Sequence, residues 1–286
     1  MFLPPMLPKE RKEPFDDERY IFEPKISGHR LLLSMENGIV RLYTRHGREI
    51  TAKYPELHQV PLSDYSGTLL DGEVACLDPE SGMLEPESDT LTSRIGLTKP
   101  MSIREAALAR PVHFFVFDIL KYRGKDIRDW PLSDRKKALA EALEGNRHIS
   151  PAIAIEHSGN ALYEALRGRG LEGIVAKSLS SPYVGRRNGN WQAIRYYEYA
   201  VVQIAGYRKN QFGWLMRHRG RIVGLLENGV PSAHKNAFLG VSKRLATGED
   251  RDYVYVEPAI EARVRYRSRT SSGELAYPEF VDFIVS

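Results

Sequence analysis

The dipeptide Asn37-Gly38 is the feature that most constrains the fold, because it separates two apolar runs, RLLLSME and IVRLYT. Asn-Gly between alternating apolar residues is the strongest local signal for a two-residue β-hairpin, since both residues tolerate the positive φ of a type I′ turn. The region from Tyr20 to Thr51 is therefore predicted to form antiparallel sheet. Further strands are predicted at residues 67–78 (GTLLDGEVACLD) and 111–120 (PVHFFVFDIL), and the second run is apolar enough for a buried central strand.

Helices are predicted between and after these strands, at residues 102–110, 133–145 and 160–170, with Ser102 as a candidate N-cap of the first. After about residue 196 the pattern changes to short strands with glycine turns and a single helix-like segment, which predicts a small five-stranded barrel. The chain is thus expected to be an α+β protein of two domains. Residues 1–196 would form antiparallel sheets with flanking helices, and residues 197–286 the small β-barrel.

Charge and cysteine content limit the partners and the setting. The chain has 41 Lys and Arg against 37 Asp and Glu, a net charge of +4, which permits a nucleic-acid partner without requiring one. The single cysteine, Cys76, excludes an intrachain disulfide framework and a cysteine-rich zinc site. No run of eighteen apolar residues occurs, and the first twenty residues lack the apolar block of a signal peptide. We therefore predict a cytoplasmic protein that does not contact a membrane.

The segment FEPKISGHR raises the first chemical question, because it places Lys25 at the end of a predicted strand. A lysine amine with a pKa near 10.4 is a nucleophile only when it is desolvated or lies near other cations or a metal. Gly28 would let the backbone approach a ligand closely, and Arg30 could grip a phosphate with two hydrogen bonds. Most lysines at strand ends are simply solvated, so Lys25 alone does not decide between these alternatives.

Five further segments carry side chains that suit phosphate and base binding, and each also has an ordinary structural explanation. Two carboxylates, Glu73 and Glu172, are of a type that usually lies at the surface, and Phe117 fits a plain core residue as well as a base-stacking one. In the same way, isolated basic residues are usually solvated. The basic candidates are Arg45 in TRHG, Lys177 in EGIVAK and Arg195 in NWQAIR.

Taken in order, the segments resemble the ATP-dependent DNA ligase branch of the covalent nucleotidyltransferases. The resemblance is nearest to short bacterial and phage ligases that lack an extra DNA-binding domain, and it covers nearly all of the chain. It implies a nucleotidyltransferase (adenylation) domain followed by an OB-fold domain. The matching segments are KISGHR, TRHG, LDGEV, FFVFDIL, EGIVAK and NWQAIR.

The resemblance implies that the lysine of KISGHR, Lys25, attacks the α-phosphate of ATP to give a lysyl-AMP. The AMP then passes to the 5′-phosphate at a nick in duplex DNA, and the 3′-hydroxyl displaces it to seal the strand. Positively charged groups and a hard metal ion, Mg²⁺ or Mn²⁺, would spread the developing phosphate charge. The implied ATP or AMP contacts are Glu23, Lys25, Arg30, Arg45, Glu73 at the ribose, Phe117 stacked on adenine, Lys177 and Arg195, with Glu172 and Glu73 at the metal.

Nicked duplex DNA is the implied partner, and we expect the protein to act as a monomer. The basic-aromatic stretch ARVRYRSRT suits a phosphate backbone, although a solvated barrel strand with alternating polar residues would look the same. An enzyme of this kind serves replication, repair or recombination, and the residues do not say which. The candidate DNA contacts are Arg186, Arg187, Arg263, Arg265 and Arg267.

The chain departs from the family pattern at three places. Ser27 stands where the family has Asp, and Ala193 and Arg195 stand where lysines are usual, so Lys177 becomes the better candidate for an α-phosphate contact. The C-terminal segment YPEFVDFIVS lacks the basic motif that orients pyrophosphate in many relatives. These departures keep two alternatives open: a weakened ligase that mainly binds nicks or ends, and an RNA ligase or capping-type nucleotidyltransferase.

Overall fold

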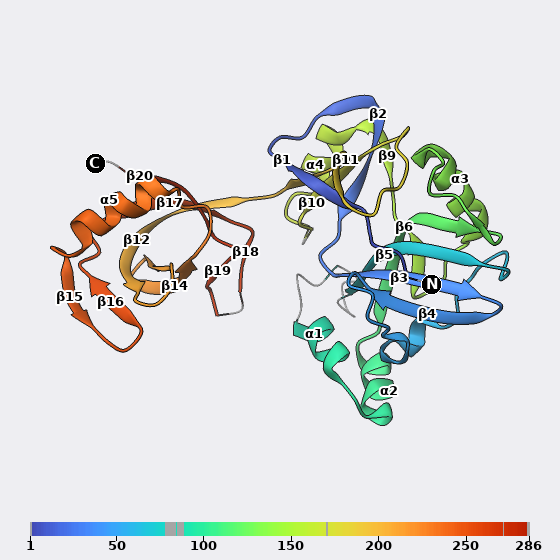
Figure 1. The fold of residues 1–286 in the computed structure, drawn as a ribbon, viewed down its shortest axis with the longest axis horizontal. Helices are drawn as coiled ribbons and strands as arrows, with labels where there is room; N and C mark the ends of the chain where they lie inside the picture. Colours follow the sequence, from blue (N-terminus) through green and yellow to red (C-terminus); the bar gives the residue numbers. More distant parts are fainter. Residues whose placement is uncertain (1, 78–83, 85–88, 170, 271, 285–286) are drawn as a thin grey trace. The chain divides into compact units, whose positions relative to one another are not determined.

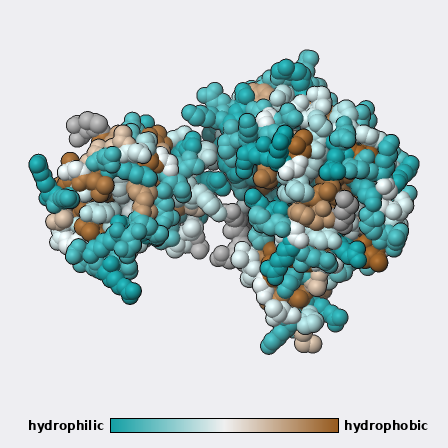
Figure 2. All heavy atoms as spheres, viewed as in Figure 1, coloured by the Kyte–Doolittle hydropathy of each residue, from teal (hydrophilic) through white to brown (hydrophobic). Residues whose placement is uncertain are grey.

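The computed structural model of the chain describes residues 2–77, 84, 89–169, 171–270 and 272–284 (Figure 1). Residues 1–195 and 196–286 form two compact units, and each is considered by itself below. No helix in these described ranges is both long and apolar enough to cross a membrane. Hydrophilic residues predominate on the face drawn in Figure 2, where apolar side chains occur in small separate groups.

The first unit contains a six-stranded sheet that begins with the predicted hairpin. Asn37 and Gly38 have φ values of 50° and 78°, as a type I′ turn requires, and they join two antiparallel strands. The sheet order is β4-β3-β5-β6-β7, with β8 parallel to β6. The strands are β3 (His29–Glu36), β4 (Ile39–Thr44), β5 (Thr68–Cys76), β6 (Val112–Tyr122), β7 (Lys125–Asp126) and β8 (Ile149–Pro151).

A second, five-stranded sheet in the same unit has the order β1-β11-β10-β2-β9. Its first pair is parallel and the others are antiparallel. Strand β2 lies between β10 and β9, and its last residue, Lys25, pairs with the first residue of β10, Gly173. The strands are β1 (Leu7–Arg11), β2 (Asp16–Lys25), β9 (Ile155–Ser158), β10 (Gly173–Ser178) and β11 (Arg187–Arg195).

In the described part of the first unit, four helices and two 3₁₀ turns accompany the sheets, and α1 and α2 lie together at one end of it (Figure 1). Lys99 is the N-cap residue of α2, so the prediction that Ser102 caps this helix is wrong; Pro100, whose fixed φ suits the first helical position, starts the helix earlier. The elements are η1 (Thr51–Lys53), η2 (Pro55–Leu57), α1 (Asp89–Gly96), α2 (Pro100–Ala109), α3 (Leu132–Ala142) and α4 (Gly159–Leu166).

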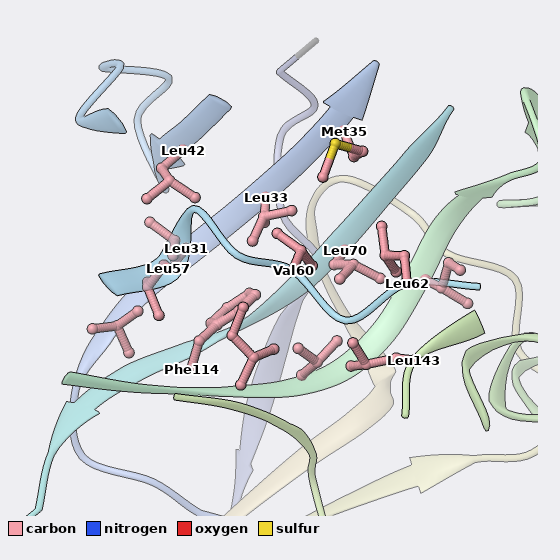
Figure 3. Close-up of a cluster of buried hydrophobic side chains, with 14 of the residues drawn as sticks. Leu31, Leu33, Met35, Leu42, Leu57, Val60, Leu62, Leu70, Phe114 and Leu143 are labelled. Carbon is pink, nitrogen blue, oxygen red and sulfur yellow. The ribbon is translucent and has the colours of Figure 1, made fainter. Parts of the chain in front are cut away.

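Both faces of the β3-β5-β6 sheet are covered. One face buries Leu33, Leu70 and Phe114 beneath the segment that carries Leu57 and Val60 (Figure 3). The opposite face joins a smaller core with side chains of the second sheet. Because both faces of the sheet are buried, the sequences of these strands are nearly continuous apolar runs. The residues of the smaller core are Met6, Leu32, Leu69, Leu120, Tyr183 and Trp191.

The second unit is a curved sheet and one helix around its own apolar core, which includes Trp214, Phe238 and Phe280. Strand β12 pairs with β13 on one side, and with β17 and β16 on the other. The α+β class with a small OB-type barrel is thereby confirmed, with seven strands in the described sheet and not five. The elements are β12 (Glu198–Arg208), β13 (Trp214–His218), β14 (Arg221–Leu226), α5 (Ser232–Ser242), β15 (Ala246–Glu249), β16 (Tyr253–Val256), β17 (Glu261–Tyr266) and β20 (Glu279–Ile284), with a separate pair, β18 (Ser268–Arg269) and β19 (Leu275–Ala276).

Candidate active site

Lys25 lies beside Glu172 because of strand pairing between β2 and β10. The backbone N–H of Glu172 donates to the Lys25 carbonyl at 3.1 Å, which fixes the two residues side by side. The Lys25 Nζ then lies 3.0 Å from Glu172 Oε2, and both side chains are about four-fifths buried, with 18% and 17% exposed. Lys25 is therefore a paired amine in a partly desolvated position and not a lysine in open solvent.

Gly28 brings the connection after Lys25 against strand β5. A Cβ atom at this position would lie 2.2 Å from the Val74 carbonyl oxygen, so a residue larger than glycine could not occupy it without a backbone shift. This approach, together with the pairing of Arg30 with Glu73 across β3 and β5, places both residues near Lys25. Burial raises the pKa of Glu73 to about 7, against the opposing charges of Arg30 and Lys25.

Arg30 is held in one position by a buried carboxylate. Its guanidinium binds both oxygens of Asp71 at 2.6 Å and donates to the Met6 carbonyl at 3.1 Å. The Tyr183 hydroxyl donates to the same carboxylate at 2.6 Å. Burial lowers the pKa of Arg30, but the charge and hydrogen bonds of Asp71, together with Tyr183 and Glu73, raise it above its ordinary value, so the guanidinium stays charged. Its carbon lies 4.5 Å from the centroid of the Phe117 ring, which fixes Arg30 against this ring.

Lys177 is a buried cation between two aromatic rings. Its Nζ lies 4.0 Å from the Phe117 centroid and 4.1 Å from the Trp191 centroid, and the two rings are nearly perpendicular. The same Nζ lies 2.6 Å from Glu23 Oε2, and Lys136 from helix α3 pairs with the other Glu23 oxygen. Burial lowers the pKa of Lys177 to about 8, against the favourable charge of Glu23. Burial raises the pKa of Glu23, but the two lysines outweigh it and the net shift is downward.

These side chains line one small cavity of about 80 Å³. It brings together six of the eight residues predicted to contact ATP: Glu23, Lys25, Arg30, Glu73, Phe117 and Lys177. Positive and negative groups therefore converge beside an aromatic ring, an arrangement that can bind an anion next to a flat base. The other lining residues are Pro8, Pro24, Ile26, Ala152, Val175 and Trp191.

The remaining predicted ATP contacts lie outside this lining. Arg195 pairs with Glu172 and with Glu10, whose Oε1 is 3.1 Å from its Nε, so it belongs to the same charge cluster as Lys25. Arg45 is exposed on the turn after β4 and does not line the cavity. Ala193 is fully buried on β11, where it pairs with Val175, so it supplies packing at a position where the family pattern has a charge.

The candidate metal residues, Glu73 and Glu172, both lie near Lys25. The Glu172 charge contributes to the raised pKa of Glu73, as expected for neighbouring carboxylates. Among the described residues no group of three or more His, Cys, Asp or Glu side chains could hold an ion. Mg²⁺ in phosphate-transfer sites is commonly held by one or two carboxylates together with substrate phosphates and water, so this donor pair fits such an ion.

The candidate DNA contacts are distributed over both units. In the first unit Arg186 and Arg187 are exposed, and Arg187 donates to the Pro8 carbonyl. In the second unit Arg263 is exposed on β17, whereas Arg265 pairs with Glu279 and Arg267 lies 4.5 Å over the Tyr277 ring.

Three residues that shape the cavity were missed by the sequence reasoning. Asp71 lies within the DGE segment and orients Arg30, but only the Glu of that segment was singled out. Tyr183 lies in SPYVGRR, which looks like a linker, and it holds Asp71. Lys136 lies in an amphipathic helix with no motif. Asp71 and Tyr183 lie in segments that resemble family motifs, and this position could have identified them. No motif in the sequence points to Lys136.

Comparison with known proteins places the chain in one family. The family model for the ATP dependent DNA ligase domain matches residues 5–194. The SPbeta prophage-derived DNA ligase-like protein LigB of Bacillus subtilis is 34% identical over 282 residues, which is 98% of each chain. The multifunctional non-homologous end joining protein LigD of Mycolicibacterium smegmatis is 28% identical, and the match spans 92% of this chain but 36% of LigD. The solved ligase domain of M. tuberculosis LigD is 26% identical, with a TM-score of 0.58 over 99% of this chain and 95% of that one.

Proposed function

The chain belongs to the ATP-dependent DNA ligase family and is a DNA ligase that uses ATP, and on that premise we propose that Lys25 is the residue that carries the adenylate. The observation that carries this proposal is the convergence of Lys25, Arg30, Glu73, Phe117 and Lys177 on one cavity. A nucleophile, fixed cations and an aromatic ring within one small volume are what adenylate transfer to an amine requires. The family match does not support the RNA ligase or capping-type alternative.

In the first step the Lys25 amine, after losing a proton, forms a bond to the α-phosphorus, and the bond from that phosphorus to pyrophosphate breaks. Phe117 supports the base, and Arg30, fixed by Asp71, lies next to it where the sugar or phosphate binds. Lys177 supplies positive charge to the α-phosphate oxygens. A divalent metal, Mg²⁺ or Mn²⁺, held by Glu172 and Glu73 would neutralise part of the phosphate charge.

Glu172 and Arg195 hold Lys25 in position before the nucleotide binds. The Lys25 amine and the Arg195 guanidinium share the Glu172 carboxylate, so Lys25 is held in place. When Glu172 turns to another cation, Lys25 loses its counter-ion and Arg195 remains as a nearby positive charge. Lys25 is then free to approach the α-phosphorus.

The later steps need duplex DNA with a nick. The 5′-phosphate takes the AMP from Lys25 and forms a pyrophosphate linkage, and the 3′-hydroxyl then forms the phosphodiester and releases AMP. We propose that Arg186, Arg187, Arg263, Arg265 and Arg267 contact the DNA backbone. Arg263 and Arg265 alternate along β17, and their partners across the pairing with β12 are Val201 and the exposed Tyr199, so basic and apolar groups share one face of the sheet.

The names of the relatives support a proposal for the biological setting of this protein. LigD relatives are named for non-homologous end joining and DNA repair, and we propose DNA repair as the setting of this protein. We further propose that it acts on nicked DNA as a monomer, because a single chain supplies the described side chains that line the cavity beside Lys25.

Incubation with α-labelled ATP and Mg²⁺ tests the proposal. The wild-type protein should acquire label, and mass spectrometry should find one AMP on the peptide that contains Lys25. Lys25→Ala should remain unlabelled, whereas Lys12→Ala, which removes an exposed lysine, should label like the wild type. Equal labelling of Lys25→Ala and wild type would exclude Lys25 as the adenylated residue.

A further inference from the structure

We propose that Lys136 is a positioning residue of the adenylation reaction: it is a second counter-ion for Glu23, and it allows Lys177 to leave Glu23 and reach the nucleotide phosphate. The proposal rests on the function proposed above, because it concerns how the same site delivers a cation. Lys136 belongs to none of the six motif segments quoted in the sequence analysis, and it does not line the cavity.

The geometry divides the two oxygens of Glu23 between two lysines. Lys177 Nζ lies 2.6 Å from Oε2, and Lys136 Nζ pairs with Oε1. Glu23 and Lys177 are almost fully buried, with side-chain exposures of 3% and 2%, whereas Lys136 retains 19%. Lys136 therefore approaches Glu23 from the side of helix α3, and Lys177 approaches it from the cavity.

Helix α3 is anchored so that Lys136 points at Glu23. The neighbouring residue, Arg135, is completely buried and binds both oxygens of Asp118 on β6, at 2.8 and 2.9 Å. Arg135 also donates to the Ser181 carbonyl at 2.9 Å. At the start of the helix, the Ser133 N–H donates to the Leu179 carbonyl at 3.0 Å. These contacts fix the helix to β6, which carries Phe117, and to the segment that follows β10. The position of Lys136 is therefore set by the protein and not by the nucleotide.

The Lys177 ammonium lies over the aromatic ring on which we propose that the base stacks. This ammonium lies about 4 Å from the centroids of both Phe117 and Trp191, and it takes up one side of a cavity of about 80 Å³. A base that stacks on Phe117 from this side must displace the ammonium, and the nearest negative charge it can move to is the phosphate of the incoming nucleotide. The movement breaks the ion pair between Lys177 and Glu23.

Glu23 is too deeply buried to be left without a positive partner. A buried carboxylate whose only counter-ion departs is strongly destabilised, because the lost ion pair is not replaced by water. Lys136 removes this obstacle, since it stays on the other oxygen while Lys177 moves. Because two lysines bind the same carboxylate, Lys177 can move from Glu23 to the phosphate with only a small loss of free energy.

The test is single-turnover self-adenylation of the full chain at saturating labelled ATP. Lys136→Met should lower the rate constant about tenfold or more, because Lys177 is then the sole counter-ion of Glu23. Lys136→Arg should restore most of the rate. The matched control is Lys137→Met, the next residue of α3, whose side chain is 78% exposed and which should adenylate at the wild-type rate.

A second background separates this role from a merely structural one. In Glu23→Gln the buried charge is absent, so adding Lys136→Met should cause no further loss of rate. A wild-type adenylation rate in Lys136→Met would overturn the proposal. So would a loss of rate on adding Lys136→Met to Glu23→Gln that is as large as the loss in the wild-type background. The second comparison remains decisive even if Lys136→Met by itself is poorly folded. If the wild type does not adenylate itself, the proposed function is wrong. If the wild type does adenylate itself, the variants test only the role of Lys136.

Discussion

The two faces of the β3-β5-β6 sheet carry opposite chemistry on the same strands. On one face Leu33, Leu70 and Phe114 pack into an apolar core (Figure 3), and on the other Arg30, Glu73 and Phe117 border the candidate site. Alternate residues of a strand point to opposite faces, so a shift of one residue in the pairing would exchange the two sets. The comparison shows how one sheet provides stability from one side and reactive groups from the other.

The largest loss of stability is expected on the apolar face. Phe114 is fully buried, and Phe114→Ala should lower the free energy of unfolding by about 4 kcal/mol, because it leaves a cavity among close-packed side chains. Chemical denaturation measures this change. The molecules that remain folded at low temperature should still self-adenylate. A complete loss of adenylation in folded protein would show that the two faces are not separate in their roles.

A slightly smaller loss, affecting both stability and activity, is expected for Asp71→Asn. This variant keeps the size of the side chain but leaves the buried Arg30 without its carboxylate, at a cost of about 3 kcal/mol in the free energy of unfolding. Because Arg30 is then no longer held against Phe117, adenylation should also slow. Unchanged adenylation in this variant would mean that the orientation of Arg30 does not matter to the reaction.

Phe117→Leu should have little effect on stability and a clear effect on nucleotide binding. Phe117 is only partly buried, and an apolar replacement of similar volume costs less than about 1.5 kcal/mol in the free energy of unfolding. The loss of stacking should weaken ATP binding by about 1–3 kcal/mol. Denaturation and ATP titration of Phe117→Leu and Phe114→Leu side by side give the comparison, with the second variant expected to keep wild-type ATP affinity.

Per pH unit, the smallest effect is a change in stability that comes from Lys177. Burial lowers its pKa from 10.5 to about 8, so between these pH values the unfolded chain binds more protons than the folded one. Relative to Lys177→Met, the wild type should therefore gain stability as pH rises through this window, by at most about 1.4 kcal/mol per pH unit, and lose that gain as pH falls to 8. A difference between the two proteins that stays constant from pH 8 to 10.5 would contradict this prediction. Lys137→Met serves as the control.

The local pattern of the chain was enough to predict much of the fold. The Asn37-Gly38 hairpin, the strand at 111–120 and the change to short strands near residue 196 all follow from spacing over fewer than twenty residues. Ends of elements were less accessible: α2 starts at Pro100 and not after Ser102, because backbone geometry and not side-chain capping decides its first turn. The barrel has more strands than expected, since short edge strands carry weak patterns.

The sequence alone determined which residue types are available at the site and in what order. The motif segments name Lys25, Glu73, Phe117 and Lys177, because their chemistry can be recognised residue by residue. Only the tertiary structure decided which of them meet. The pairing of β2 with β10 places Glu172 on Lys25, and the packing of α3 brings Lys136 to a carboxylate 113 positions away in the chain. Such contacts form between residues that are far apart in the sequence and close in space. A local pattern of residues carries no information about these distances.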